Sequence, residues 1–476
     1  MTIEGETAFS TLLSADAQDQ AKVLAYFDSL TKDRDGWKSC AQSLMKHKVS
    51  DTQHQFLCFQ VLEHYVRNAY SSSGPEDQLL LKRLMAYWLE RLAGGDSPEV
   101  EPPVFLRNKS AQLFALVFVV DFPNRWLNFV KEVFLVHIEQ NIEQIYVIEF
   151  YLRFLLAVDS EVADKDIQRT KQELERNTVI KDRLREVSIP EMVESWIFIL
   201  TKFSGVNSKI ISLCLNVIGC FVSWIDIGLI ANERFVPEIV KSVERSDTQE
   251  AAVDCVCSIL SKGMDPSLKV QLVQAMDDVL VKSGIYSVAD ADDVESYTKI
   301  SELVNCVGIV LIECWNKMTK AGQVATANST VLPLIESKIE PMLECLAHED
   351  NDVSGNVSEF SHQYVQLLKQ MGPNGLDDKR KALVKQLLMA VLQKYRYPDD
   401  YDHEREGETE ALFLEYRKEI KLVLINIGQL DNELTLNTVQ DIVEKTLNNW
   451  QTLGYRDVEL AITLIYMMAE AIPCRL

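Results

Sequence analysis

A dense group of basic side chains lies between residues 169 and 185. Arginine and lysine can bind phosphate, and the planar guanidinium of arginine pairs with two phosphate oxygens at once. Carboxylates are interleaved with these bases, a pattern equally typical of a solvent-exposed helix that pairs with its own charges. The segment therefore supports two interpretations, a surface that binds nucleic-acid phosphates and an ion-paired surface helix. The bases are Arg169, Lys171, Arg176, Lys181, Arg183 and Arg185, and the acids are Glu173, Glu175, Asp182 and Glu186.

Two further charged segments follow in the second half of the chain. The first is basic and little interrupted, but lysines are common on helix surfaces, so a solvated face is the favoured interpretation. It contains Lys379, Arg380, Lys381, Lys385, Lys394 and Arg396. The second, residues 398–410, is acidic, and a solvated loop is its usual interpretation. Its acids are Asp399, Asp400, Asp402, Glu404, Glu406, Glu408 and Glu410.

No residue pattern typical of an enzyme is present in the sequence. There is neither a glycine-rich phosphate loop nor an H-E-x-x-H motif, and the histidines are scattered without metal-ligand spacing. The acids Asp277 and Asp278 are adjacent, so on a helix their side chains would point in different directions. We therefore predict a binding protein with no catalytic residues, metal or cofactor.

The ten cysteines show neither zinc-binding nor disulfide spacing. Cys255 and Cys257 lie in a predicted buried helix, and Cys306 and Cys314 lie in an apolar run. Small buried hydrophobic side chains are the favoured interpretation. Reduced thiols imply an intracellular compartment.

The net charge limits the choice of partner. The chain has 476 residues and a formal net charge of −23. An acidic protein repels nucleic acids at long range, so RNA binding would require a local basic surface. A basic protein partner fits the net charge more directly.

Hydrophobic residues recur at helical spacing almost throughout the chain, and we find no alternating strand pattern. Val23, Leu24, Phe27 and Leu30 form one stripe, and Trp37, Cys40, Ala41, Leu44 and Met45 form the next. Further helices are predicted to follow Asp51 and the segment Ser73-Gly74-Pro75. The apolar run 210–225 is short for a membrane span and is interpreted as a buried helix.

Short breaks with capping signals separate the predicted helices. Asp265-Pro266 predicts an N-cap followed by proline at the first helical position. The segments 247–250 and 188–191 have capping-box spacing, and Gly284 and Gly372 predict helix ends. Two helices with their turns occupy about 40–47 residues, the period of HEAT repeats. We therefore predict an all-α superhelical solenoid of roughly ten HEAT hairpins, whose core is continuous because neighbouring repeats stack.

Three motifs, in order, resemble the Ran-binding N-terminus of the importin-β superfamily of nuclear transport receptors. They are FLCFQVLEHYV at 56–66, FLRNKSAQLF at 105–114 and DFPNRW at 121–126. Later segments are similar to the exportin-T family in particular. These segments are residues 176–186, 222–226, 229–232, 262–266, 406–417 and 448–451.

The resemblance covers nearly the whole chain and implies two regions. Residues 1–140 would be N-terminal HEAT repeats that bind Ran. Residues 141–476 would be further HEAT repeats of the exportin-T type, with a charged insert at 159–185 and the acidic stretch at 398–410. The sequence ends where the family continues, so we expect the carboxy-terminal half of such a receptor to be missing.

The resemblance also implies the residues that contact each partner. Gln60, Glu63 and Arg67 share one polar helix face, which an ordinary solvated face explains equally well. The implied Ran-binding residues are Gln60, Glu63, Arg67, Arg107, Lys109, Glu404, Glu406 and Glu408. The implied tRNA-binding residues are Arg176, Lys181, Arg183, Arg185, Lys379 and Arg380.

The implied function is that of a nuclear export receptor. It would bind tRNA cooperatively with Ran-GTP, contact nuclear pore proteins and shuttle between nucleus and cytoplasm as a monomer. Two alternatives remain open: a HEAT-repeat scaffold without an RNA role, and a receptor of the same superfamily for another protein or RNA cargo.

Overall fold

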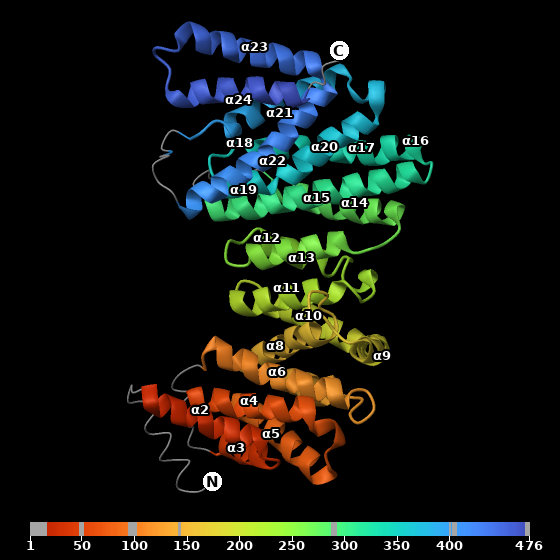
Figure 1. Cartoon of the computed structure of the whole chain (residues 1–476). Coiled ribbons are helices and arrows are strands. Elements are labelled where there is room, and N and C mark those ends of the chain that lie inside the picture. The colour runs from red at the N-terminus through yellow and green to blue at the C-terminus, as the bar shows by residue number, and fades with distance from the viewer. Residues whose placement is uncertain are drawn as a thin grey trace. The chain divides into compact units, whose positions relative to one another are not determined.

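The computed structural model describes residues 17–46, 52–93, 102–140, 144–286, 293–398, 401 and 407–471. Every regular element within these ranges is a helix and none is a strand, which confirms the prediction of an all-α chain. None of the helices described is both long and apolar enough to cross a membrane. The chain divides into two compact units, residues 1–238 and 239–476 (Figure 1).

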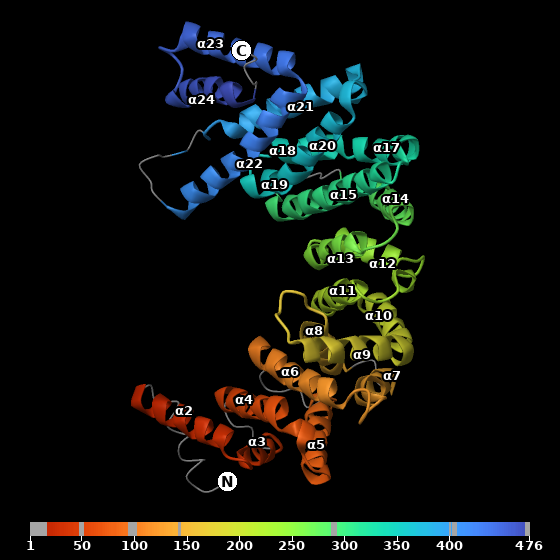
Figure 2. The ribbon, with the colours of Figure 1, turned by 45° about the vertical axis from the view of Figure 1, so that its right-hand side comes forward.

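In the first unit, one helix of each repeat contributes to a continuous row. Helices α4, α6, α8 and α11 contact one another in succession, while α3 packs on α4 and α10 packs on α11 (Figure 2). The elements are α2 (Ala17–Lys32), α3 (Gly36–Leu44), α4 (Thr52–Asn68), η1 (Tyr70–Ser72), α5 (Pro75–Ala93), α6 (Val104–Asp121), η2 (Lys131–Leu135), α7 (Val136–Gln140), α8 (Ile145–Val162), α9 (Lys171–Val187), α10 (Ile189–Phe203), α11 (Ser208–Val222) and η3 (Ile227–Leu229). Helix α12 (Val236–Val243) crosses the division between the units.

The second unit repeats this arrangement around a long helix, α15. Helix α15 has 27 residues and contacts α13, α14 and each of α16 to α20, and the row continues through α20, α22 and α24. The elements are α13 (Gln249–Ser261), α14 (Pro266–Ser283), α15 (Val294–Lys320), α16 (Val324–Thr326), η4 (Ala327–Val331), α17 (Leu332–Glu336), α18 (Ile339–Ala347), α19 (Asn351–Asn356), α20 (Ser358–Gln370), η5 (Gly372–Gly375), α21 (Asp378–Tyr395), α22 (Glu408–Leu430), α23 (Asn432–Asn449) and α24 (Tyr455–Ala471).

Aromatic packing fixes α6 against α8. The rings of Phe114 and Phe150 lie 4.9 Å apart, and those of Phe118 and Phe154 lie 5.8 Å apart, each pair edge to face. Full burial of one such side chain contributes about 1.5–3 kcal/mol to stability. This apolar contact sets the spacing of the two helices and so positions the polar side chains along the same row.

The predicted ends of α14 are confirmed. The Asp265 carboxylate accepts hydrogen bonds from the backbone N–H groups of Ser267 and Leu268, at 2.9 and 3.3 Å, and Pro266 follows the cap. Gly284 ends the helix with a φ of 76°, a left-handed conformation that glycine adopts without strain.

The capping box predicted at Asp247 is wrong. The N-cap of α13 is Thr248, whose hydroxyl donates to the Ser242 carbonyl at 2.8 Å. Asp247 instead forms an ion pair with Arg245 at 2.8 Å. The carboxylate is therefore held by a neighbouring cation and does not cap the helix.

The capping box predicted at Ser188 is also wrong, and a capping box at Thr170 was not predicted. Ser188 is the N-cap of α10, but its side chain forms no capping hydrogen bond. A reciprocal capping box does form at the start of α9, between Thr170 and Glu173. The T-x-x-E spacing of that segment was the signal that could have identified it.

The hydrophobic stripe predicted for α2 is partly wrong. Val23 and Phe27 are buried, but Leu24 is 58% exposed. Helix α2 packs against α3 and α4, so its buried stripe is narrow, and Leu24 lies about 100° around the helix from Val23. The stripe of α3 is confirmed for Trp37 and Leu44, which are both buried.

Candidate functional site

Charged side chains of the first unit connect α4, α6 and α8. We call them the inter-repeat ion network. It consists of Glu63 and Arg67 on α4, Arg107 and Lys109 on α6, and Glu149, Arg153 and Glu161 on α8. The network contains four of the residues that the sequence predicts to face Ran. Glu63, Arg67 and Lys109 share one set of ion pairs, and Arg107 belongs to a second set around Glu149.

Glu63 connects α4 to α6. Its carboxylate accepts hydrogen bonds from the Lys109 ammonium and, at 3.0 Å, from Arg67. Burial alone would raise the pKa of Glu63, but these two cations outweigh burial and hold its pKa below the ordinary value. Glu63 is therefore a charged anchor between two repeats.

Glu149 connects α6 to α8 and is the most enclosed acid of the network. It accepts a hydrogen bond from Arg107 at 2.5 Å and another from Arg153 at 2.7 Å, and its side chain is 10% exposed. Arg153 also donates to the Asn108 side-chain oxygen at 2.6 Å. A cation in the first turn of α6 opposes the helix dipole, and Glu149 compensates for this unfavourable position of Arg107.

Arg67 extends the network to the end of α8. Its guanidinium lies 2.7 Å from the Glu161 carboxylate. The backbone carbonyl of Glu161 accepts a hydrogen bond from the Asn177 side chain of α9 at 3.0 Å. Glu161 is therefore the point at which the ion network meets the helix that carries the basic segment. Gln60, also predicted to face Ran, is exposed one turn before Glu63 on α4.

The basic segment 176–185 forms part of helix α9, and most of its bases have partners nearby. Arg183 pairs with Glu186 and Arg185 pairs with Asp182, each at 2.5 Å. Arg185 also donates to the Trp224 carbonyl at 2.9 Å. These contacts are those of an ion-paired helix, and all of the side chains remain at least partly exposed to solvent.

The remaining two bases of this segment are Arg176, which is exposed, and Lys181, which is partly buried. Arg176 donates to the Asn177 side-chain oxygen at 3.1 Å, and burial lowers the pKa of Arg176 from its ordinary value. Lys181 is half-buried on the same helix and attracts the charge of Asp159.

The second basic group opens α21 in the second unit. Arg380 pairs with Glu336 of α17 at 2.7 Å and with Asp377 at 3.3 Å, and Lys379 lies 3.5 Å from Glu336. Arg380 is mostly enclosed, whereas 73% of the Lys379 side chain is exposed. Of the two, Lys379 is the one whose charge faces solvent.

The acidic stretch lies largely outside the described residues. Glu404 and Glu406 fall outside them, and Glu408 begins α22 without a described side chain. Two described residues of the stretch contact each other: the Tyr401 hydroxyl donates to Glu410 at 2.8 Å.

An aromatic cluster that the sequence did not reveal lies beside Tyr401. The Arg417 guanidinium lies over the rings of Tyr395 and Tyr397, at 4.2 and 4.0 Å from their centroids, and it also pairs with Glu459 at 3.0 Å. Tyr397 stands 4.4 Å from Tyr401. The sequence did offer one signal, because tyrosines at the end of one helix are followed by an arginine on the next helix.

Comparison with known proteins finds similarity to exportins. A model described as exportin 1-like protein matches residues 103–256, and a model described as exportin-T matches residues 325–475. Exportin-T of Homo sapiens is 40% identical over 460 residues, which cover 97% of this chain and 47% of that protein. Exportin-T of Danio rerio is 40% identical over 461 residues, and that of Arabidopsis thaliana is 26% identical over 446 residues, covering 97% and 91% of this chain and 47% and 44% of the relatives.

The chain is similar to exportin-T over nearly its whole length. It spans about half the length of the curated relatives it matches. The resemblance to exportin-T and to the importin-β superfamily is thereby confirmed. A solved structure titled "Importin13 cytosolic state" matches with a TM-score of 0.57 and 12% identity, covering 82% of this chain and 47% of that one. At that identity it shows the fold alone, and it confirms the predicted HEAT-repeat solenoid.

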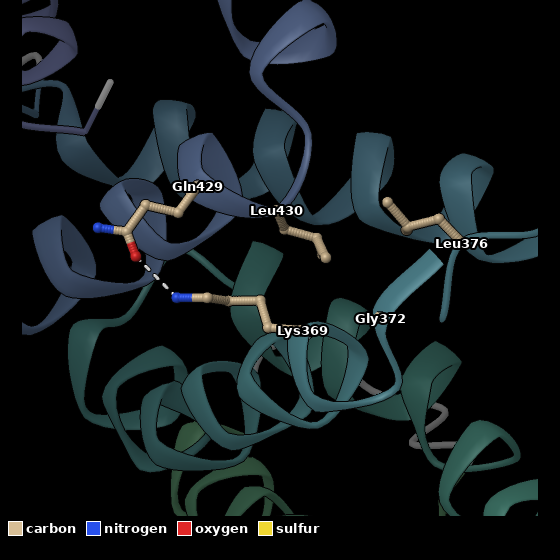
Figure 3. A pocket seen from close by; sticks show the side chains of 5 residues that line it. All are labelled: Lys369, Gly372, Leu376, Gln429 and Leu430. Carbon is tan, nitrogen blue, oxygen red and sulfur yellow. Dashed lines mark hydrogen bonds between the residues drawn. The ribbon is translucent and has the colours of Figure 1, made fainter. Parts of the chain in front are cut away.

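One cavity of the second unit is shown in Figure 3, and none of the predicted contact residues lines it. It has a volume of about 360 Å³, and its lining residues are Lys369, Gly372, Leu376, Gln429 and Leu430. Lys369 donates to the Gln429 side-chain oxygen at 2.7 Å. Among the described residues, no group of three or more His, Cys, Asp or Glu side chains could hold a metal ion.

Proposed function

We propose that this chain acts as a nuclear export receptor that binds tRNA cooperatively with Ran-GTP and shuttles between nucleus and cytoplasm. The observation that carries the proposal is its 40% identity to human exportin-T over 97% of the chain. The function is one of binding, so it depends on surfaces and their coupling. Transit through the nuclear pore by contact with pore proteins, and a monomeric state, are part of the same proposal.

Residues 1–140 are proposed to bind Ran, through Gln60 and the α4 and α6 members of the ion network. Each cation of the network is already paired with an acid of this chain. A partner would therefore gain less binding free energy from charge than from hydrogen-bonding groups that are held in fixed positions. The network holds those groups in one arrangement before binding, which lowers the entropy lost on association. The acidic residues Glu404, Glu406 and Glu408 are proposed to supply a second, electrostatic contact with a basic face of Ran.

Helix α9 is proposed to contact the tRNA backbone. The chain as a whole is acidic, so a local group of bases is required to hold phosphates. Arg176, Lys181, Arg183 and Arg185 supply such a group, and Lys379 and Arg380 are proposed as a second contact. Contacts of this kind position an RNA without reading its sequence.

Glu161 offers a physical route for cooperativity between the two ligands. Its carboxylate binds Arg67, a proposed Ran-facing residue, and its carbonyl binds Asn177, the neighbour of Arg176. A ligand that shifts the end of α8 would therefore alter the positions of both sets of residues. Coupling of this kind is reciprocal, so tRNA should strengthen Ran-GTP binding as much as Ran-GTP strengthens tRNA binding.

A pull-down on immobilised Ran tests the proposal. The chain should be retained on Ran loaded with a non-hydrolysable GTP analogue, retained less on Ran-GDP, and retained more on the GTP form when tRNA is added. Retention that is indifferent to tRNA would favour a receptor for another cargo. Absence of retention on either form would favour a HEAT-repeat scaffold.

A further inference from the structure

The cavity shown in Figure 3 has a cationic end and an apolar end. It lies where the end of α20 and the η5 turn meet the end of α22, and its volume is about 360 Å³. The Lys369 ammonium and the Gln429 amide lie on one side of the view, and the Leu376 side chain lies on the other. Leu430 lies between them. Cavities that bind small molecules usually have volumes of about 300–1,000 Å³, so this one suits a small ligand.

Lys369 brings a positive charge to this cavity without an acid beside it. Its ammonium donates to the side-chain oxygens of Asn426 at 3.0 Å and Gln429 at 2.7 Å, and both acceptors are neutral. Within the described part of the chain it forms no ion pair with a carboxylate. Arg380 and Arg417 of the same unit do pair with acids, as expected in a chain with 71 acids and 48 bases. A lysine ammonium has three N–H donors, so one of them is available to a ligand.

A buried side chain holds Lys369 in place. Asn426 is only 8% exposed, and its amide nitrogen donates to the Leu422 carbonyl one turn earlier on α22, at 2.8 Å. This hydrogen bond turns the amide oxygen of Asn426 toward Lys369. Gln366 donates to the same oxygen at 2.6 Å, and the His362 ring lies 3.3 Å from the Gln366 nitrogen. Lys369 is therefore part of a fixed polar row and not a free surface lysine.

The spacing of these residues places the polar row between two packed helices. His362, Gln366 and Lys369 are spaced i, i+4 and i+7 on α20, and Asn426 and Gln429 are spaced i and i+3 on α22, so each set shares one face. Helices α20 and α22 pack directly on each other. Removing polar groups from water costs free energy that an apolar contact would not, so helix packing alone does not require this row. A hydrogen-bonded row does fix one geometry, as a binding site requires.

The other end of the cavity is apolar and open. Leu376 and Leu430 are both half-buried. Gly372 has a φ of 64°, a conformation that glycine adopts without strain, and a Cβ built there would meet no atom within 4 Å. This wall therefore has no side chain, and a ligand can reach the two leucines past it.

We propose that this cavity binds a small organic anion, namely a carboxylate with a short aliphatic chain. The carboxylate accepts a hydrogen bond from Lys369, and the aliphatic chain lies against Leu376 and Leu430. A charge-assisted hydrogen bond is stronger than a neutral one, so the carboxylate competes well with the Gln429 amide for the ammonium. An RNA phosphate could use the charge of Lys369 but would leave the leucines uncovered, so the apolar end favours the carboxylate. The proposal does not depend on binding of tRNA or Ran.

Hexanoate is the probe, and its binding to the whole 476-residue chain is measured by ligand-observed NMR titration in a buffer without phosphate. A dissociation constant of about 1 mM is expected for a ligand of this size. Hexanamide has the chain without the charge, acetate has the charge without the chain, and inorganic phosphate represents an RNA backbone. Hexanoate should bind more tightly than each of these three.

Single variants place the probe in the cavity. Lys369→Met removes the charge but keeps the length of the side chain, and it should weaken hexanoate binding by about tenfold or more. Lys418→Met is the matched control, because Lys418 lies on α22 with 73% of its side chain exposed, and it should leave the affinity unchanged. Leu376→Ala should weaken hexanoate binding but not acetate binding. Circular dichroism checks that each variant is folded, and if Lys369→Met is not, Leu376→Ala and the four probes decide.

Four results would overturn the proposal. The first is the absence of saturable hexanoate binding, and the second is equal affinity for hexanoate and hexanamide, which would exclude recognition of the anion. The third is an unchanged affinity in folded Lys369→Met or in Leu376→Ala, which would place the probe elsewhere. The fourth is phosphate that binds at least as tightly as hexanoate and is displaced by tRNA, which would make Lys369 a contact for the RNA backbone.

Discussion

Arg67 on α4 and Glu161 on α8 form an ion pair of 2.7 Å, although α6 lies between their helices in the order of packing. Glu63, one turn before Arg67, pairs at the same time with Lys109 of that intervening helix. The first unit therefore has polar connections between repeats that are not nearest neighbours. These connections can be tested independently of any ligand.

Removal of the Glu149 charge should destabilise the first unit. Glu149→Gln leaves Arg107 and Arg153 enclosed with a weaker acceptor, and breaking a buried pair in this way costs about 3 kcal/mol. Urea unfolding monitored by circular dichroism measures the loss. Glu194→Gln is the control, because its pair with Arg234 is exposed to solvent and should contribute little to stability. Equal urea midpoints for the two variants would show that the ion pairs of Glu149 stabilise the chain no more than the exposed pair of Glu194.

The charge of Glu63 should make the stability of the first unit depend on pH in the acid range. Its pKa is lower in the folded chain than in the unfolded chain, where it is about 4.3. The stabilisation it provides is complete above that unfolded value and is lost as pH falls through the folded pKa. Melting temperatures measured between pH 3 and 6 should fall less steeply for Glu63→Gln than for the unmodified chain. Parallel curves would exclude the predicted linkage.

Charge reversal in the acidic stretch should weaken Ran-GTP binding. Replacing Glu404, Glu406 and Glu408 with lysine removes the proposed attraction to a basic face of Ran, and the loss should shrink as salt rises. Surface plasmon resonance at several salt concentrations measures it. The matched control reverses exposed acids of α23, namely Glu433, Asp441 and Glu444. Affinity lost equally in both triple variants would reflect net charge and not a contact.

Removal of bases from α9 should flatten the salt dependence of tRNA binding. Each lost phosphate contact should reduce the slope of log affinity against log salt by about one unit. Arg176, Lys181 and Arg185 are replaced by alanine, and filter binding is measured with Ran-GTP present. Alanine at the exposed lysines 32, 317 and 418 is the control. An unchanged slope in the α9 variant would show that these bases do not contact phosphate and belong to an ordinary surface helix.

The caps of α13 and α14 should respond differently to the same substitution. Asp265→Ala removes two hydrogen bonds to the start of α14 and should destabilise the second unit by about 1 kcal/mol. Asp247→Ala loses an exposed pair with Arg245 and should destabilise the second unit less than Asp265→Ala does. Thermal unfolding of both variants makes the comparison, and a larger loss for Asp247 would reverse the assignment of the caps.

The sequence predicted the helices well because their signals are local. Asp265 and Pro266 are adjacent, and the buried residues of α3 recur within two turns, so the pattern and the structure concern the same few residues. The cap at Asp247 was wrong because Arg245, two residues away, competes for the carboxylate.

The ion network could not be predicted, because its partners are distant in sequence. Arg67 and Glu161 are separated by 94 residues, and Arg107 and Glu149 by 42. Only the stacking of α4, α6 and α8 determines which charges meet. The sequence placed Glu63, Arg67, Arg107 and Lys109 in one region through a resemblance, but it gave no indication of the acids on α8 that hold them.

The 27-residue helix α15 has a consequence for how the second unit unfolds. In a simple repeat array each hairpin depends on its two neighbours, so unfolding can begin at an end and proceed stepwise. Because α15 packs against α13, α14 and every helix from α16 to α20, loss of any part of it removes support from all of them together. Amide hydrogens from α13 to α20 should therefore exchange as a single cooperative block, with one common free energy of opening.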